Sequence, residues 1–257
     1  MNILAIGDVV GSVGCRFLRS RLPALKKTYG IDLVIANGEN SADGNGITPV
    51  SAEYLYQSGV DVITGGNHSF RRREAFARFD EDETLLRPLN YPAGAAPGNG
   101  YCLYDMGRLQ VGVVNLIGTT YMESMPCPFE AVDTLLKSGV LPKITLIDFH
   151  CEATSEKRAM GFFLDGRVSA VFGTHTHVPT ADERVYPKGT GYLTDLGMTG
   201  PIESVLGIEP WQSVESFLGG LPGRYKPAEG PCKLQGAVFT LDSDTGLCTA
   251  VERVDIR

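Results

Sequence analysis

The opening stretch Ile3-Leu4-Ala5-Ile6-Gly7-Asp8-Val9-Val10-Gly11 decides the fold class. Its apolar residues predict a buried strand, and the Gly-Asp pair that follows predicts a turn. An amphipathic segment from Cys15 to Tyr29, closed by Gly30, predicts a helix with Pro23 as a kink. The first unit is therefore strand, turn and helix, and it places Asp8 directly after a strand.

Two further units repeat this order. The apolar run from Asp32 to Ala36 ends in Asn37-Gly38-Glu39-Asn40, and the run from Asp61 to Thr64 ends in Gly65-Gly66-Asn67-His68, after a helix predicted from Pro49 to Ser58. Successive strand-helix units predict a parallel sheet with helical crossovers. Because open α/β sheets place ligands at the carboxyl ends of their strands, we expect these polar residues to share one edge.

The rest of the chain mixes strand directions. The predicted elements are an antiparallel hairpin of Tyr101 to Asp105 and Gln110 to Leu116, a helix from Phe129 to Lys137, strands from Lys143 to His150, Ser169 to Phe172 and Tyr192 to Asp195, a helix opening at Thr154, and an antiparallel pair of Gly236 to Leu241 and Thr249 to Val254. The Gly- and Pro-rich segments Tyr91 to Gly100 and Gly219 to Pro231 are predicted as surface connections.

The stretch Val171-Phe172-Gly173-Thr174-His175-Thr176-His177 ends in two imidazoles separated by one residue. If this stretch is extended, both rings leave the same face, where they could bind one metal or two neighbouring metals. The competing interpretation is that one ring packs and the other is solvated. The chain holds only four His, and the others, His68 and His150, also end apolar runs.

Collected from the strand ends, the candidate donors are Asp8, Glu39, Asn40, Asn67, His150, His175 and His177, with His68 beside them. Carboxylates, carboxamides and imidazoles suit Mn, Fe or Zn. The donors are too many for one tetrahedral ion but fit two ions that share a carboxylate. Such a pair, about 3.5–4 Å apart, stabilises the attacking and leaving oxygens of a phosphoryl transfer.

Each donor also has a simpler interpretation. Asp8 could cap the following helix, Glu39-Asn40 and Asn67 could form turns, and His150 could be a packed residue. Cys151 beside His150 could be a nucleophile, but neighbours on a strand point to opposite faces. No phosphate-binding loop of the G-x-x-x-x-G-K-[ST] type and no G-x-S-x-G motif occurs.

Composition limits the partners. The 257 residues carry a formal net charge of −7, which argues against stable nucleic-acid binding. No apolar run approaches the roughly 18 residues of a membrane helix, no signal peptide is recognised, and six scattered Cys suggest no disulfide framework, so a cytoplasmic protein is expected. We expect one domain over residues 1–257, with the oligomeric state, homo-oligomers included, left open.

The basic run Arg71 to Arg73 could be a solvated helix start or attract phosphate.

The motifs together resemble the YmdB-like bacterial metallophosphoesterases over essentially the whole chain. The resemblance rests on Gly7-Asp8-x-x-Gly11, Asn37-Gly38-Glu39-Asn40, Gly66-Asn67-His68, Asp148-Phe149-His150-x-Glu152-x-Thr154-Ser155-Glu156-Lys157, Gly173-Thr174-His175-Thr176-His177-Val178-x-Thr180-Ala181-Asp182 and Thr194-Asp195-Leu196-Gly197-Met198-Thr199-Gly200-Pro201. It implies an α/β fold of the calcineurin-like kind, a sandwich of two mixed β-sheets packed face to face and flanked by helices.

The resemblance also implies roles for the strand-end residues. Asp8, Asn40 and His177 would hold one metal, Asn67, His150 and His175 the other, with Glu39 bridging and His68 as general acid. Two divalent or mixed-valence ions are implied, iron first and manganese second, with zinc fitting less well. This chain departs from the wider pattern in two places. Asp8-Val9-Val10 lacks the His of Asp-x-His, and Ser69-Phe70-Arg71 replaces the Thr-Trp-Asp of many relatives.

The implied activity is hydrolysis of cyclic nucleotides, with 2′,3′-cyclic ones favoured. A hydroxide shared by the two ions would attack phosphorus, and His68 would protonate the departing ribose oxygen. The first alternative is a metal-stabilised protein that senses nucleotides or signals with little turnover. The second is a phosphomonoesterase or nucleotidase that uses the same site.

Overall fold

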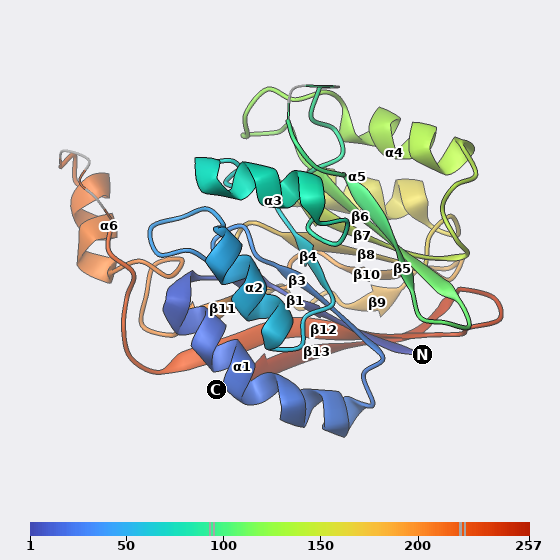
Figure 1. Ribbon diagram of the computed structural model, residues 1–257, viewed down its shortest axis with the longest axis horizontal. Coiled ribbons are helices and arrows are strands. Elements are labelled where there is room, and N and C mark those ends of the chain that lie inside the picture. The colour runs from blue at the N-terminus through green and yellow to red at the C-terminus, as the bar shows by residue number, and fades with distance from the viewer. Residues whose placement is uncertain (93, 95, 221–222, 224) are drawn as a thin grey trace.

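Two mixed β-sheets pack face to face, and helices cover their outer faces (Figure 1). The computed structural model describes residues 1–92, 94, 96–220, 223 and 225–257. The sandwich expected from the resemblance is therefore confirmed.

The first sheet combines the predicted parallel strands with strands from the end of the chain. Its order is β2 (Asp8–Val9), β11 (Met198–Pro201), β12 (Cys232–Leu241), β1 (Asn2–Ile6), β3 (Leu33–Asn37) and β4 (Val62–Thr64), with β13 (Cys248–Ile256) also paired to β12. The neighbours β1, β3 and β4 are parallel, as predicted, whereas β12 runs antiparallel to β1. The predicted antiparallel pairing of the last two strands is also confirmed.

The second sheet begins with the predicted hairpin. Its order is β5 (Tyr101–Asp105), β6 (Gln110–Ile117), β7 (Ile144–His150), β8 (Ala170–Thr174), β10 (Gly191–Leu193) and β9 (Arg184–Val185). The hairpin of β5 and β6 is antiparallel, while β6, β7, β8 and β10 are parallel to one another. The carboxyl ends of these parallel strands therefore lie along one edge.

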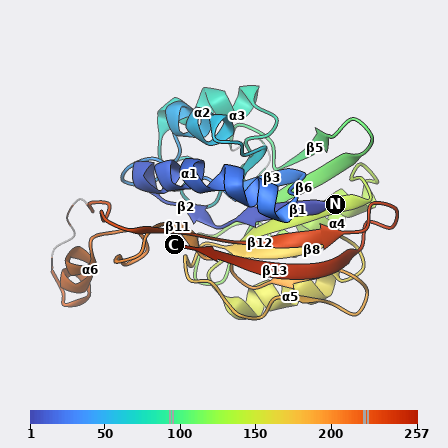
Figure 2. The same ribbon diagram turned by 90° about the horizontal axis from the view of Figure 1, so that it is seen from below.

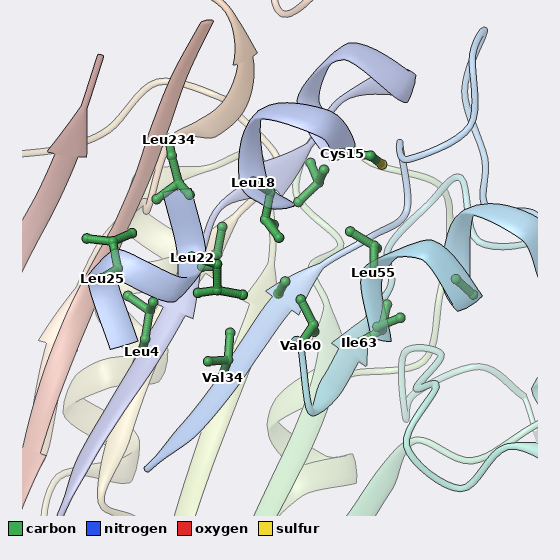
Figure 3. Packing of buried hydrophobic residues seen from close by; sticks show 14 of the residues in the cluster. Leu4, Cys15, Leu18, Leu22, Leu25, Val34, Leu55, Val60, Ile63 and Leu234 are labelled. Atoms are coloured by element: carbon green, nitrogen blue, oxygen red, sulfur yellow. The ribbon is translucent and has the colours of Figure 1, made fainter. Parts of the chain in front are cut away.

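The alternation of side chains along β1 builds two cores. Leu4 contributes to the cluster under α1 (Gly11–Tyr29) and α2 (Pro49–Gln57), shown in Figure 3. Ile3 points the opposite way and joins residues of both sheets, Phe172 among them. A strand with both faces buried reads as a continuous apolar run, which is what the opening stretch shows.

Of the remaining helices, two lie between β4 and β5, two follow strands of the second sheet, and the last projects from the body. They are η1 (Arg73–Ala75), α3 (Phe76–Glu81), α4 (Pro128–Lys137), α5 (Thr154–Leu164) and α6 (Pro210–Phe217). Residues of α4 and α5 pack on the outer face of the second sheet. Helix α6 projects away from the body in both views (Figures 1 and 2). Among the described residues, no helix could span a membrane.

Several predicted boundaries were wrong in ways that matter for the site. Helix α1 begins at Gly11 rather than Cys15, because Gly14 lets its first turn approach Thr199 O of β11, where a Cβ would lie 2.4 Å from that oxygen. Strand β8 starts at Ala170 and continues to Thr174, two residues past the predicted end. Helix α6 and strand β11 were not predicted. Both predicted surface connections, residues 91–100 and 219–231, include positions outside the described residues.

Candidate active site

All eight candidate residues lie at the shared edge where strands of both sheets end. Asp8 begins β2, Glu39 and Asn40 follow β3, Asn67 and His68 follow β4, His150 ends β7, and His175 and His177 follow β8. The structure brings the eight together, as the distances below show.

One group of donors surrounds Nε2 of His150. Oδ1 of Asn67 lies 3.0 Å from it, Nδ1 of His175 also lies 3.0 Å away, and Oε1 of Glu39 lies 3.2 Å away. His150 and Glu39 are fully buried. Two residues from the first sheet and two from the second therefore meet at one point.

A second group surrounds His177. Its Nε2 lies 3.5 Å from Oδ1 of Asp8 and 3.3 Å from Nδ2 of Asn40. That Asp8 oxygen is buried and accepts no hydrogen bond from any described residue. An orphaned carboxylate oxygen beside an imidazole nitrogen is what a cation site presents before it is filled.

Glu39 joins the two groups. Its Oε1 accepts a hydrogen bond from Asn40 Nδ2 at 3.0 Å, in addition to the contact with His150, while its Oε2 accepts the backbone N–H of His68 at 2.9 Å. A carboxylate in this position could contact two ions at once. The predicted bridging role of Glu39 is compatible with this geometry.

The outer nitrogen of each candidate His ligand meets an acceptor. Nδ1 of His177 donates to the carbonyl of Leu206 at 3.1 Å, and Nε2 of His175 donates to Oε2 of Glu152 at 3.2 Å. Each bond fixes the tautomer and turns the unprotonated nitrogen inward. Such outer partners are usual for metal-binding imidazoles.

The tautomer of His150 is fixed by a chain of two hydrogen bonds through Thr174 to Asp148. The Thr174 hydroxyl donates its single hydrogen to Oδ1 of Asp148 at 2.7 Å, so it must accept from Nδ1 of His150, 3.0 Å away. Thr64 donates to the other oxygen of Asp148. The inner nitrogen of His150 is thereby directed at Glu39 and His175.

Gly66 makes room for this arrangement. A Cβ at this position would lie 2.3 Å from Oε2 of Glu39 and 2.3 Å from Nε2 of His150. Only glycine lets the backbone pass so close to both donors. Together with the orphaned Asp8 oxygen and the inward imidazoles, this space shows that the residues present fit a metal centre.

The pKa shifts of the buried groups also show that the site stabilises positive charge. Burial lowers the pKa of His150, but the carboxylates of Glu39 and Asp8 outweigh it and raise that pKa to about 9. Burial raises the pKa of Asp8, yet His177 and His150 hold it well below its usual range. Burial, with the nearby charge of His150, lowers the pKa of His175 to about 4. A proton on His150 therefore occupies the place that a metal ion would take.

The His175-x-His177 segment is a turn, not an extended strand, which corrects the sequence-based expectation. The φ angles of His175 and His177 are 100° and 61°. Strand pairing ends at Thr174, because His175 N–H donates to Oδ2 of Asp8 at 3.0 Å instead of continuing the ladder. Each residue other than glycine with a positive φ angle lowers the stability of the fold by about 1–3 kcal/mol, so the surrounding contacts must hold the turn in place.

The side-chain amide of Asn40 points its nitrogen, not its oxygen, toward the candidate metal donors. Its Oδ1 faces Nδ1 of His68 at 2.9 Å, and its Nδ2 faces Glu39 and His177. An amide nitrogen does not bind a metal, so ligation by Asn40 requires the amide to rotate by half a turn.

The helix-cap interpretation of Asp8 fails, and so does the nucleophile interpretation of Cys151. Val10 occupies the N-cap of α1, and the N–H of Ser12 in the first turn donates to Oδ1 of Asp43 at 2.8 Å, so Asp8 is not the cap. Cys151 is buried in the core between the second sheet and its helices, on the face away from His150, as predicted.

Within the basic run Arg72 has a structural role, and so does Phe70 just before the run. Arg72 donates to the carbonyls of Asn45 and Asp43, at 3.0 and 2.7 Å, and so holds the loop after Asn40. Phe70 packs edge-on against Phe76 and Tyr91. The departure at Ser69-Phe70-Arg71 thus fills an aromatic cluster.

Sequence reasoning missed the residues that orient the donors. These are Gly66, Asp148, Glu152, Thr174 and Leu206. Gly66, Asp148, Glu152 and Thr174 stand in the motifs quoted for the resemblance, but no role was assigned to them. Nothing in the sequence marks Leu206, because it acts through its backbone carbonyl.

The fold and the donor cluster define a metallophosphoesterase-type α/β protein. The family model described as "YmdB-like protein" matches residues 4–254, and the chain belongs to this family. It is 44% identical to the 2′,3′-cyclic-nucleotide 2′-phosphodiesterase of Bacillus subtilis, over 99% of this chain and 96% of that protein.

Solved structures agree. A hypothetical protein from Thermus thermophilus superposes with a TM-score of 0.93 at 40% identity, covering 99% of this chain and 98% of that one. A novel phosphatase from Mycoplasma pneumoniae gives 0.94 at 35% identity, covering 100% and 93%. The resemblance inferred from the motifs is confirmed.

Proposed function

We propose that this hydrolytic phosphoesterase is a dinuclear metal-dependent phosphodiesterase that opens cyclic nucleotides, 2′,3′-cyclic ones first. The observation that carries the proposal is the meeting of His150 Nε2 and His175 Nδ1, 3.0 Å apart beside the Glu39 carboxylate. With the outer nitrogens bonded to acceptors, two inward lone pairs repel one another unless a cation lies between them.

The residues divide into two sets of donors. Asn67, His150 and His175 would hold one ion, Asp8 and His177 with a rotated Asn40 the other, and Glu39 would contact both. When bound, two ions supply a nucleophile at neutral pH and neutralise charge that develops on phosphorus oxygens. Iron, and after it manganese, suits this mixture of carboxylate, carboxamide and imidazole.

His68 supplies the proton for the leaving oxygen. Its backbone N–H is fixed by Glu39, and its Nδ1 lies 2.9 Å from the Asn40 amide. When that amide rotates to ligate, its NH₂ group would donate to Nδ1, so the hydrogen of His68 would lie on Nε2, the nitrogen left for substrate. Its side chain keeps 22% of its surface exposed, whereas Glu39 beside it keeps 1%. An accessible ring at the rim of a buried centre suits proton donation.

The substrate assignment is supported by the Bacillus subtilis relative, whose name specifies 2′,3′-cyclic nucleotides. The Mycoplasma pneumoniae relative is named a putative phosphatase/phosphodiesterase, which keeps phosphomonoesters as the second candidate. The cytoplasmic location stays a prediction.

The test is turnover by protein loaded with iron or manganese. We expect hydrolysis of 2′,3′-cyclic AMP and of bis-p-nitrophenyl phosphate, both abolished by chelation and restored by metal. Faster hydrolysis of p-nitrophenyl phosphate than of the diester would favour the phosphomonoesterase. Tight nucleotide binding without turnover by fully loaded protein would favour the sensing protein.

A further inference from the structure

We propose that the buried pair Lys157 and Asp195 positions the His175-x-His177 turn, and so sets the metal affinity of the centre. The inference rests on the proposed function, since it concerns the same metals. Neither residue is among the candidate donors, although both lie in motifs noted in the sequence.

The pair is close and completely enclosed. Nζ of Lys157 lies 2.6 Å from Oδ2 of Asp195, and each side chain is 1% exposed. Replacing such a pair by apolar residues often costs a protein nothing in stability. A buried charge pair is therefore weak evidence for stability, and its contacts with the rest of the site decide its role.

Those contacts lead to the turn. The Asp195 oxygen that binds Lys157 also accepts the N–H of Thr176, the residue between the two histidines, at 3.3 Å. Thr180, just beyond the turn, donates its N–H to the Asp195 carbonyl at 3.1 Å and accepts the Asp195 N–H on its hydroxyl at 3.0 Å. The turn is thus attached to Asp195 at its centre and at its end.

A second connection runs to the other sheet. The remaining carboxylate oxygen of Asp195 accepts the N–H of Gly197 at 2.9 Å, and the carbonyl of Gly197 accepts the N–H of Asp8 at 3.2 Å. One carboxylate therefore fixes the backbone beside three candidate donors, Asp8, His175 and His177.

Lys157 reaches this position from α5 by crossing β8. A Cβ at Gly173 would lie 2.9 Å from both Cδ and Cε of Lys157 and 1.9 Å from the carbonyl of Thr194. The absence of a side chain at Gly173 opens the path. Since the φ angles of His175 and His177 are both positive, the turn needs such an outside anchor.

The test compares two variants with wild type. Lys157→Met/Asp195→Asn removes both charges together, so no unpaired charge is buried, but the amide loses the ammonium that holds its oxygen against Thr176. Asp195→Glu keeps both charges and moves the carboxylate by one methylene. The control is Lys137→Met, because Lys137 makes a 2.6 Å pair with Asp133 on the surface, where its side chain is 75% exposed.

Two readouts separate positioning from stability. Titration calorimetry with Mn²⁺ on metal-free protein measures affinity, and thermal unfolding of the metal-free form measures stability. We expect both variants to bind Mn²⁺ at least about tenfold more weakly than wild type, with little change in Tm, and the control to match wild type. Wild-type affinity in either folded variant overturns the inference. If the double variant does not fold, Asp195→Glu alone decides, because it leaves the charges paired.

The failure of the proposed function would look different. Wild-type protein would then bind fewer than two Mn²⁺ ions or hydrolyse no diester, whatever the variants do.

Discussion

Glu39 and His150 meet across the gap between the two sheets, with Oε1 of Glu39 3.2 Å from Nε2 of His150 and both side chains buried. Glu39 follows β3 of the first sheet, and His150 ends β7 of the second. The contact places an anion and an imidazole at the same point from opposite halves of the fold.

We expect Glu39→Gln to impair the centre more than Asn40→Ala. The glutamine keeps the size of Glu39 but loses the charge that offsets both ions, whereas Asn40 is neutral and lies beside one group of donors only. Metal content by elemental analysis should fall below two per chain in Glu39→Gln. Two bound metals and near-normal turnover in that variant would show that Glu39 does not bridge.

His68→Ala should retain both metals and lose activity in proportion to the basicity of the leaving group. A general acid contributes about 10²–10⁴-fold, and a ribose oxygen needs that proton far more than p-nitrophenolate does. We therefore expect a large loss of kcat on 2′,3′-cyclic AMP and a distinctly smaller loss on bis-p-nitrophenyl phosphate. Loss of metal would make His68 a ligand, and equal losses on both substrates would assign it to positioning.

Gly66→Ala should weaken metal binding at the centre without changing the two sheets. The new methyl group would lie 2.3 Å from both Glu39 Oε2 and His150 Nε2, so at least one donor must move. We expect at least about tenfold weaker Mn²⁺ binding with an unchanged circular-dichroism spectrum. Gly223→Ala is the control, because a Cβ there meets no atom of the described residues within 4 Å. Normal Mn²⁺ affinity in Gly66→Ala would show that the donors do not need this space.

Metal-free protein should lose stability as pH rises from 7 to 9. The folded-state pKa of His150 is raised to about 9, so its protonated form stabilises the fold fully below the unfolded pKa of about 6.5, and this contribution disappears as pH passes 9. Mn²⁺ affinity should rise over the same interval, because the competing proton leaves. Tm of chelated protein and calorimetry in buffers of different ionisation enthalpy measure the two trends. A rising Tm of the chelated protein would contradict the assignment.

Much of the site could be predicted because it follows local rules. Each strand of the first units is a short apolar run, and the residue after it must lie at the sheet edge, which located Asp8, Glu39 and Asn67. The sandwich itself came only through the resemblance, because nothing local specifies which faces of two sheets meet.

The features that were missed depend on contacts between distant segments. The turn at His175 is set by Asp8, 167 residues earlier, and the tautomer of His177 by a carbonyl 29 residues later. Helix α6 is 8 residues long, too short for apolar periodicity to distinguish it from a loop, and its apolar side chains stay exposed, Phe217 at 90%.

The position of β12 has a consequence for how the protein is made. This strand, Cys232–Leu241, lies between β11 and β1 in the first sheet, although every candidate donor precedes residue 178. During translation the donors leave the ribosome long before the strand that completes their sheet. A chain that stops short of Cys232 would carry every donor, but it would lack the strand that joins β2 and β11 to β1 and its neighbours.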